Sequence, residues 1–308
     1  MSNIIFRPHY FGGKNNNFDE IFVPLSLKSV LKYNANSNVY FISNDPNFVL
    51  KNFRECPTNL HCYLFDDFID DNIINITNSY VHLSHNQYGF EKFCILSYFY
   101  IYNLMEKLNI NSLYVVETDV LIFDNLHSVF SKFYDLNNTD AILANENIMC
   151  SSYVTKIYLE TFCNSAIKFY NDIVVLNCLK NMFTKMKSGG ICDMTINDWI
   201  YKNPTFNALF TNLNSINKKI HITELTQILP NNSIFDNYLA KIDYNDENFE
   251  SETKHISNNN TIKIKKIYSV DGMAYFKLNN NFIKCNSMHF QGSCKELMQD
   301  IYNEFINK

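Results

Sequence analysis

Hydrophobic and polar residues follow two different periods along the first part of the chain. Asn3–Pro8 is a short β-prone run, and Phe18–Tyr33 carries apolar residues at helical spacing. Val39–Ile42 is again apolar and β-prone. The order strand, helix, strand predicts a parallel sheet whose strands are joined by crossover helices.

The clearest elements lie between residues 89 and 123. Gly89–Leu108 carries an apolar stripe at spacings of three and four, which predicts a helix packed on a sheet. Ser112–Val116 is typical of a buried parallel strand, and it runs directly into the acidic triplet ETD at 117–119 and a second apolar run, Val120–Phe123. Acids at the end of a buried strand are the main chemical signal, because open α/β sheets bind ligands outside the carboxyl ends of their strands.

The second half is less regular. Asp271-Gly272 is a strong signal for a two-residue hairpin turn, and the polar stretch Asp243–Asn260 predicts an exposed loop. The other expected elements are helices near Ser128–Leu136, Lys156–Tyr170 and Asp172–Met186, strands at Ala141–Leu143 and Phe282–Phe290, hairpin arms at Ile262–Val270 and Met273–Leu278, and an amphipathic helix at Cys294–Ile306.

Composition narrows the class of protein. The chain has 308 residues, of which 46% are hydrophobic and 19% charged, enough for a large core. Its formal charge of −5, without a basic stripe, argues against a nucleic-acid partner. No apolar run reaches the ~18 residues that span a bilayer and no signal-peptide pattern is present, so we expect a soluble, cytoplasmic chain. The nine cysteines form no C-x-x-C pair and are expected to be reduced thiols.

The two acids of the triplet suggest a metal site. Glu117 and Asp119 are separated by one residue, so in an extended segment both side chains point to the same side. Two crowded carboxylates repel each other unless a cation lies between them, and Mg²⁺ and Mn²⁺ accept oxygen ligands while leaving positions open for substrate phosphates. The alternative is a pair of solvated acids at a strand end. The apolar runs on both sides favour the metal site.

Four segments resemble GT-A glycosyltransferases. YVVETDVLIFDNL looks like their Asp-x-Asp region, and FEKFCILSYFYIYNLMEKLNI resembles the helix before it in glycosyltransferase-like proteins of bacteria and large viruses. GGICDMT resembles their acceptor-side loop and helix, and MHFQG their C-terminal histidine segment. The resemblance implies a GT-A, Rossmann-like α/β fold with a mixed, mostly parallel sheet flanked by helices and a C-terminal β-hairpin and helix. It implies a single domain over 1–308, with a nucleotide-sugar half at 1–127 and an acceptor half at 128–308.

The resemblance also implies a set of metal ligands. Asp119 and His289 are expected to bind a Mn²⁺ or Mg²⁺ ion that bridges the two phosphates of a sugar nucleotide, and Glu117 to contact the cation or the ribose. Glu117 stands where the family more often has Asp. The chemistry agrees with this assignment, because a cation stabilises the charge that develops on the leaving diphosphate.

Asp193 is the expected catalytic carboxylate on the acceptor side. It follows Gly189 and Gly190, whose missing side chains would let an acceptor approach closely. In an inverting enzyme Asp193 would be the general base, and in a retaining enzyme it would orient the acceptor or stabilise positive charge on the sugar. The alternative is an N-cap of a helix that begins at Met194. Trp199, the only tryptophan, would stack on a sugar face or pack in the core.

The nucleotide is expected at the ends of the first two strands, where a turn containing glycine lets backbone come close to a ligand. Lys92, which opens the long helix, and Lys295, which follows the histidine segment, are candidates for contacts with the phosphates. The alternative for Lys92 is an exposed lysine on the helix surface. The donor-binding candidates are Tyr10, Phe11, Gly12, Asn44, Lys92, Glu117 and Lys295.

Three functions are consistent with these residues. The first is a metal-dependent glycosyltransferase that moves a sugar from a UDP-sugar, or another nucleoside-diphosphate sugar, to a glycan, protein or lipid-linked acceptor. The second is a non-catalytic protein that binds a sugar nucleotide or carbohydrate on the same scaffold, with Glu117 as a sign of drift. The third is a metal-dependent phosphohydrolase that uses the same acids and releases inorganic phosphate. The sequence leaves the sugar, the stereochemical course and the oligomeric state open.

Overall fold

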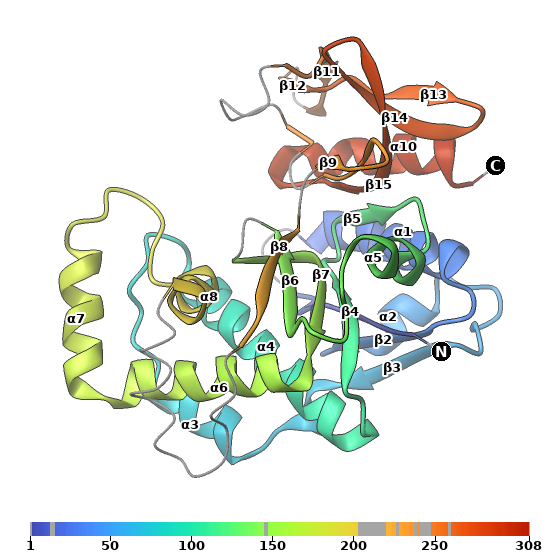
Figure 1. Cartoon of the computed structure of the whole chain (residues 1–308). Helices are drawn as coiled ribbons and strands as arrows, with labels where there is room; N and C mark the ends of the chain where they lie inside the picture. The colour runs from blue at the N-terminus through green and yellow to red at the C-terminus, as the bar shows by residue number, and fades with distance from the viewer. Residues whose placement is uncertain are drawn as a thin grey trace.

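The computed structural model describes residues 2–12, 16–144, 147–202, 220–225, 228–236, 239–240, 248–257 and 260–307, with the backbone alone at 16–20. Its centre is a seven-stranded sheet in the order β3-β2-β1-β4-β7-β6-β8 (Figure 1). The strands are β1 (Asn3–Phe6), β2 (Asn38–Ser43), β3 (Leu60–Leu64), β4 (Ser112–Val116), β6 (Ala141–Ala144), β7 (Ile148–Thr155) and β8 (Ile222–Leu225).

The middle of this sheet is parallel and apolar on both faces. β1 pairs in parallel with β2 and β4, and β2 with β3. β7 runs antiparallel to β4 and β6, while β6 and β8 are parallel, so the sheet is mixed but mostly parallel, as expected. Within β4, Leu113 and Val115 enter one hydrophobic cluster, and Tyr114 and Val116 enter the other. This two-sided burial explains why β4 reads as a continuous apolar run.

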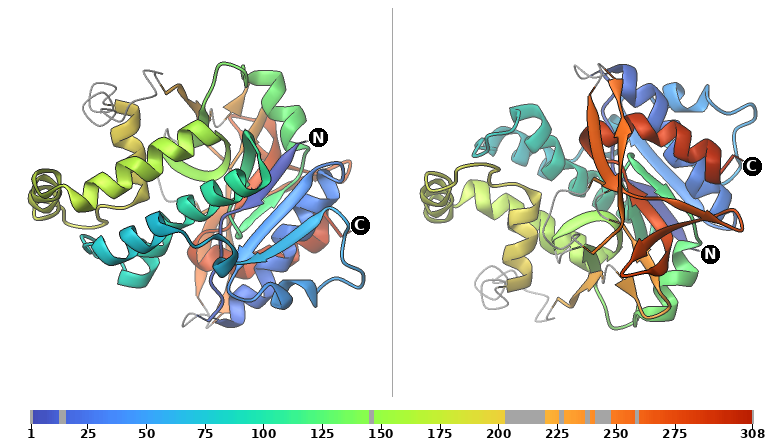
Figure 2. Two further views of the ribbon diagram at one scale, coloured as in Figure 1. Left: turned by 90° about the horizontal axis from the view of Figure 1, so that it is seen from below. Right: turned by 90° about the horizontal axis from the view of Figure 1, so that it is seen from above.

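Helices cover both faces of the central sheet (Figure 2). α3, α4, α6, α7 and α8 contribute to one hydrophobic cluster, and α1, α2, α5 and α10 to the other. Among the described residues, no helix is long and apolar enough to cross a membrane. The helices are α1 (Asn16–Tyr33), α2 (Pro46–Leu50), α3 (Asp71–Ser79), α4 (Tyr88–Leu108), α5 (Leu126–Phe133), α6 (Lys156–Asn171), α7 (Ile173–Phe183), α8 (Asp193–Lys202) and α10 (Met298–Phe305), with 3₁₀ helices η1 (Phe65–Phe68) and η4 (Gly292–Leu297).

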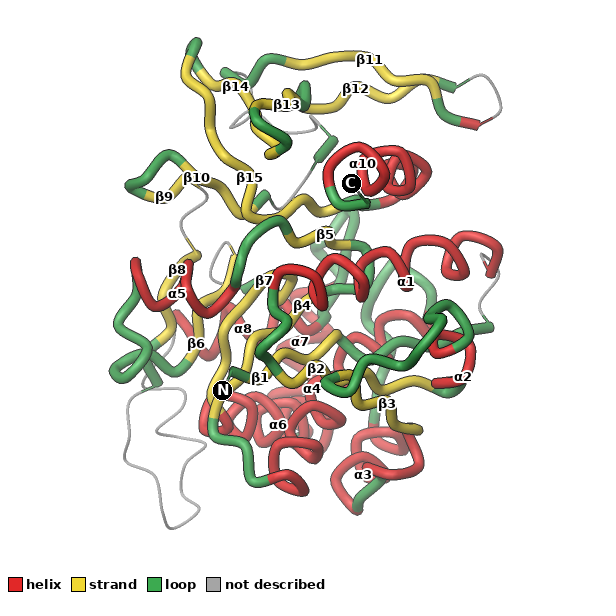
Figure 3. Tube along the Cα trace, turned by 90° about the vertical axis from the view of Figure 1, so that its right-hand side faces the viewer, coloured by secondary structure: helices red, strands yellow, loops and turns green. Residues whose placement is uncertain are grey.

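A second sheet is built mainly from the C-terminal part of the chain (Figure 3). Its strand order is β13-β14-β15-β10-β9, and β5 pairs with β15. Because β5 directly follows the acidic triplet, its antiparallel pairing with β15 places Val120 opposite His289 and brings the C-terminal strand to the end of β4. The strands are β5 (Val120–Ile122), β9 (Ile228–Leu229), β10 (Ser233–Phe235), β13 (Tyr268–Val270), β14 (Met273–Leu278) and β15 (Asn281–His289), beside a separate hairpin of β11 (Ser251–His255) and β12 (Thr261–Lys265).

The two-residue turn at Asp271-Gly272 is confirmed. Val270 pairs with Met273 across it, so β13 and β14 form a tight antiparallel hairpin. Both turn residues have positive φ, 50° at Asp271 and 77° at Gly272. Those values are required by the turn type whose twist matches that of the flanking strands, and Asp-Gly adopts them readily.

Other expectations in this region need correction. The stretch 243–260 is only partly a loop, because Ser251–His255 forms β11, while 241–247 and 258–259 lie outside the described residues. The run Ile262–Val270 is not one strand but two, and its first part pairs with β11 rather than with β14. The expected helix at Cys294–Ile306 begins as the 3₁₀ helix η4 and becomes α-helical only at Met298.

Candidate functional site

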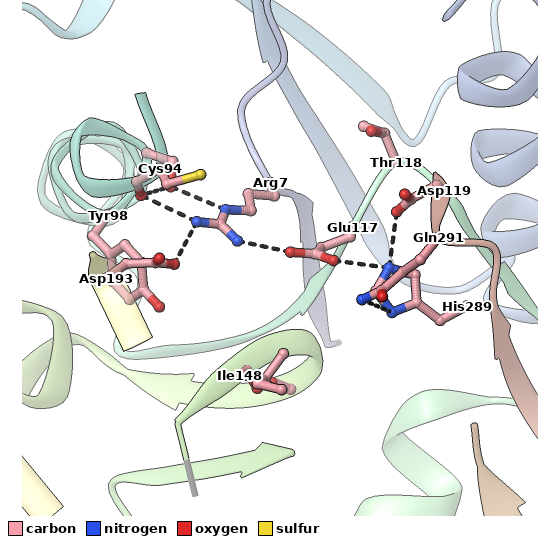
Figure 4. Close-up of polar contacts among 12 residues, drawn as sticks. Arg7, Cys94, Tyr98, Glu117, Thr118, Asp119, Ile148, Asp193, His289 and Gln291 are labelled. Carbon is pink, nitrogen blue, oxygen red and sulfur yellow. Dashed lines mark hydrogen bonds and ion pairs between the residues drawn. The ribbon is translucent and has the colours of Figure 1, made fainter. Parts of the chain in front are cut away.

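Glu117 and Asp119 lie in a short loop between β4 and β5 that hydrogen bonds hold in place. The Glu117 N–H donates to the Cys150 carbonyl of β7 at 2.9 Å, and the Val120 N–H donates to the Glu117 carbonyl at 3.2 Å. From α1, the Ser26 hydroxyl donates to the Val120 carbonyl at 2.5 Å. The backbone of the loop that carries the two carboxylates is therefore held at the carboxyl end of β4 (Figure 4).

His289 ends β15 and reaches both carboxylates. The next residue, Phe290, donates its N–H to the Asp119 carbonyl at 2.9 Å, which fastens β15 to the acidic loop. His289 Nε2 lies 3.1 Å from Glu117 Oε2 and 3.2 Å from Asp119 Oδ1. Since its side chain is only 2% exposed, the imidazole is held between the two carboxylates inside the protein.

The three groups change one another's protonation. Burial acts to lower the pKa of His289, but Asp119 and the other hydrogen-bond partners raise it well above its usual value. Burial acts to raise the pKa of Glu117 and of Asp119, but the interaction with His289 lowers both pKa values by more. Arg7 further lowers the pKa of Glu117, and Lys295 that of Asp119, so the pKa of each acid is below its usual value. These shifts favour the charged form of all three groups.

The same residues fit a divalent cation. Glu117, Asp119 and His289 each offer one ligand atom, and these atoms lie within 4.8 Å of one another. Two carboxylate oxygens and one imidazole nitrogen are a donor set that suits Mn²⁺. The protonated imidazole already places positive charge between the carboxylates, and metal binding requires that proton to leave.

Lys295 joins this cluster from η4. Its Nζ lies 3.0 Å from Asp119 Oδ2, and it also lies over the ring of Phe22, 4.6 Å from the ring centre. The lysine side chain is 30% exposed, so the ammonium group is in contact with both the buried acid and solvent. The structure thus places Lys295 beside the candidate metal ligands.

Arg7, which the sequence analysis did not select, joins Glu117 to Asp193. Its Nη1 donates to Glu117 Oε1 at 2.7 Å, and its Nη2 donates to Asp193 Oδ2 at 2.6 Å. Asp193 is the first residue of α8 itself, one position later than an N-cap, and it is 5% exposed. A signal for Arg7 was present, because the 26 basic residues comprise 24 Lys and only 2 Arg, and one of the two directly follows the first strand.

The glycine pair before Asp193 is packed against the protein's own chain. Gly190 forms an isolated antiparallel bridge with Ser84, and the Ile191 N–H donates to the Leu83 carbonyl at 2.7 Å. A Cβ on Gly190 would overlap the backbone and side chain of Ser84. The missing side chain of Gly190 thus makes room for Ser84, so the space expected for an acceptor is taken at Gly190, whereas nothing lies within 4 Å of a Cβ at Gly189.

Gly190→Ala is therefore expected to destabilise the protein by about 1–3 kcal/mol, the usual cost of forcing extra atoms into a packed site. Gly89→Ala is the matched control, since nothing lies within 4 Å of a Cβ at that position in α4 and alanine favours helices. Urea unfolding of both variants measures the difference. Equal stabilities would contradict the close approach of Ser84.

The turn after β1 carries three of the donor-binding candidates. The side chain of Asn44 makes two hydrogen bonds to the backbone of Phe11: its Oδ1 accepts from the Phe11 N–H at 2.7 Å, and its Nδ2 donates to the Phe11 carbonyl at 2.7 Å. Phe11 is buried against Phe48, with ring centres 4.4 Å apart. Tyr10 is 57% exposed and its ring is parallel to that of Phe65 at 6.4 Å. Gly12 has a φ of 119°, so the turn needs a residue without a Cβ there.

The contacts of Lys92 and Trp199 are with aromatic residues. Lys92 Nζ lies 5.6 Å from the centre of the Tyr88 ring. Trp199 meets Phe169 edge to face at 4.8 Å and packs against the hydrophobic cluster that contains α4 and α6. The structure thus places Trp199 against the core, and neither residue is brought to the carboxylates by these contacts.

Comparison with known proteins gives similarities of fold. No protein-family model matches the sequence, and a search of curated proteins returned no significant match. One similar solved structure is mouse xyloside xylosyltransferase 1 in its apo form, which is 11% identical over 65% of this chain and 81% of that chain, with a TM-score of 0.43. Another is the apo WbbM bifunctional glycosyltransferase, which is 9% identical over 100% of this chain and 50% of that chain, with a TM-score of 0.46. A cytidylyltransferase from Leptospira borgpetersenii is also similar, with 12% identity over 71% of this chain and 100% of that chain and a TM-score of 0.35. The chain thus spans half the length of WbbM.

Proposed function

We propose that this chain is a metal-dependent glycosyltransferase of the GT-A type. It transfers a sugar from a UDP-sugar to a hydroxyl group of a glycan, protein or lipid-linked acceptor. The observation that carries the proposal is the convergence of Glu117, Asp119 and His289 at the carboxyl end of β4, a central strand of a mostly parallel sheet. This edge is where open α/β sheets bind ligands, and the donor atoms suit a cation that also binds phosphate.

The diphosphate of the donor belongs beside this cluster. Breaking the bond between the anomeric carbon and the phosphate oxygen leaves a diphosphate with additional negative charge. A bound Mn²⁺ or Mg²⁺ ion supplies Lewis-acid stabilisation of that charge. Glu117, Asp119 and His289 hold the ion, and Lys295 contributes a second positive charge 3.0 Å from Asp119.

The nucleoside belongs at the turn after β1. Tyr10 offers an exposed ring on which a base can stack. The ring of Phe65 is parallel to the Tyr10 ring, and the two ring centres are 6.4 Å apart. The two hydrogen bonds between Asn44 and Phe11 fix the turn that presents Tyr10. Resemblance of the ETD triplet and its flanking runs to the Asp-x-Asp region supports a nucleoside-diphosphate donor, and UDP is the nucleotide that we propose.

The acceptor belongs on the side of Asp193. As the new bond forms between the acceptor oxygen and the anomeric carbon, the acceptor hydroxyl must lose its proton. Asp193 is the carboxylate that we assign to this side, either as the base or as the group that orients the acceptor. In this assignment residues 1–127 bind the nucleotide sugar, 128–308 bind the acceptor, and His289 returns from the second half to complete the metal site.

A thermal-shift panel tests the proposal. UDP-, GDP-, CMP- and ADP-linked sugars are each added with Mn²⁺ or with a chelator, since a ligand at 100 times its Kd adds about 2.7 kcal/mol of stability. We expect a Mn²⁺-dependent shift with UDP-sugars and release of UDP when an acceptor is present. Binding without release of UDP would favour the non-catalytic protein, and release of inorganic phosphate would favour a phosphohydrolase. No shift with any nucleotide would contradict the proposal.

Metal binding is expected to strengthen as pH rises. The carboxylates raise the pKa of His289, so the metal-free protein binds a proton at this residue. The proton stabilises the folded protein at low pH, and this contribution is lost as pH rises through the folded-state pKa. An ion must displace this proton, and apparent Mn²⁺ affinity should rise by up to about tenfold per pH unit below that pKa. Calorimetry in two buffers of different ionisation enthalpy counts the released proton. A pH-independent affinity with no proton released would show that His289 does not bind the ion.

A further inference from the structure

Arg7 occupies a junction between the two sides of the candidate site (Figure 4). It directly follows β1, and its N–H donates to the Val116 carbonyl at 2.8 Å, so its backbone continues the pairing of β1 with β4. The side chain is 16% exposed. This places a permanently charged group inside the protein, at the sheet edge where the candidate metal ligands begin.

The guanidinium group joins three separate elements. Besides its bonds to Glu117 and Asp193, Nη2 donates to the Cys94 carbonyl at 3.1 Å and Nε donates to the Ser97 hydroxyl at 3.2 Å. The loop after β4, helix α4 and the start of α8 are thus held by one planar group. A lysine has a single ammonium nitrogen and cannot reproduce this fork, and Arg7 is one of only two arginines in a chain with 24 lysines.

The geometry also links two carboxylates through one charge. Glu117 uses Oε1 for Arg7 at 2.7 Å and Oε2 for His289 at 3.1 Å, so its second oxygen is turned toward the metal ligands. Asp193 binds the other arm of the same guanidinium at 2.6 Å. If the carboxylate of Asp193 is replaced by a neutral amide, the positive charge of Arg7 is balanced by Glu117 alone, and Glu117 becomes a weaker ligand for a cation.

We propose that Arg7 is a positioning residue that couples the acceptor-side carboxylate Asp193 to the metal-side carboxylate Glu117. This inference rests on the proposed function. Arg7 fixes the orientation of Glu117 toward the ion and transmits the charge state of Asp193 to it. A group that binds Asp193, such as an acceptor hydroxyl, competes with Arg7 for this carboxylate. Its binding then changes how tightly the metal and its diphosphate are held.

A double-mutant cycle on metal affinity tests the coupling. Mn²⁺ Kd is measured by calorimetry for the full-length wild type, Asp193→Asn, Arg7→Gln and the double variant. Asp193→Asn should weaken Mn²⁺ binding at least about threefold in the wild type and by less than about 1.5-fold beside Arg7→Gln. Arg7→Lys is the second background, because lysine keeps the positive charge but lacks the forked guanidinium group. It also allows the test to be made if Arg7→Gln does not fold. Asp124→Asn, whose carboxylate pairs with Lys284 instead, should leave Mn²⁺ affinity unchanged in every background.

Kinetics separate positioning from mere structural support. Arg7→Lys should raise the Mn²⁺ concentration needed for half-maximal activity, and at saturating Mn²⁺ it should still lower kcat for sugar transfer at least about tenfold, because the ligands remain but are misoriented. Equal effects of Asp193→Asn in all backgrounds, with Mn²⁺ still bound, would overturn the inference and leave the proposed function standing. Failure of the wild type to bind Mn²⁺ would overturn both.

Discussion

Asp119→Asn is expected to abolish metal-dependent turnover while leaving the fold intact. The substitution removes one of the three proposed ligands, and outer-shell changes alone commonly cost 10–100-fold in metal affinity or activity, so we expect a loss of at least about 100-fold. The amide oxygen can still accept from Lys295, whose ammonium group is partly exposed and is not left buried without a partner. The measurements are Mn²⁺ affinity, release of UDP and circular dichroism.

Asp124→Asn is the matched control for this substitution. Asp124 lies five residues further along the chain and pairs with Lys284 at 2.6 Å, away from the three ligand atoms. It changes the net charge by the same amount, so it reproduces any general electrostatic effect. We expect Mn²⁺ affinity close to that of the wild type. An Asp119→Asn protein that binds Mn²⁺ and turns over as well as this control would refute the assignment of Asp119 as a ligand.

Lys265→Met is expected to lower the free energy of unfolding by about 3–5 kcal/mol, because it leaves a buried carboxylate without its counter-charge. Lys265 Nζ lies 2.7 Å from Asp236 Oδ1, and the two side chains are 3% and 0% exposed. Asp236 Oδ2 is buried and makes no hydrogen bond within the described residues. The backbone N–H of Lys265 donates to the Leu239 carbonyl, and the Leu239 N–H donates to the His289 carbonyl, so the pair supports the strand that carries a candidate metal ligand.

Two further variants separate charge burial from loss of packing. Asp236→Asn added to Lys265→Met removes the uncompensated charge and should recover much of the lost stability. Lys266→Met alters the neighbouring lysine, whose pairing with Glu250 is on the surface, and should change stability little. Denaturant unfolding compares all four proteins. If Lys265→Met and Lys266→Met are equally stable, the ion pair between Lys265 and Asp236 does not stabilise the fold.

Local patterns predicted the elements that form the centre of the fold. Ser112–Val116 was expected as a strand and has those bounds, because burial on both faces leaves a continuous apolar run. The helix expected at Gly89–Leu108 is present and begins one residue earlier, at Tyr88. It was predictable because its apolar stripe faces the sheet. Two acids directly after such a strand are visible to the same reasoning, since their position depends only on where the strand ends.

Features that depend on pairing between distant segments were not predictable in this way. The second sheet forms because β5, three residues long, pairs with β15 more than 160 residues later, and no local period encodes that register. Gly190, three residues before Asp193, suggested an open approach, but its bridge to Ser84 comes from tertiary packing. Arg7 was overlooked because a lone charged residue after a strand has no periodic signature, and its role follows only once α4 and α8 are placed.

The most direct test of the account is anomalous X-ray diffraction from crystals grown with Mn²⁺ and UDP. The account predicts one strong Mn²⁺ peak in contact with Glu117, Asp119 and His289, with phosphate oxygens of UDP completing its coordination. A Mn²⁺ peak at other residues, or UDP bound at another edge of the sheet with His289 still between the two carboxylates, would contradict it.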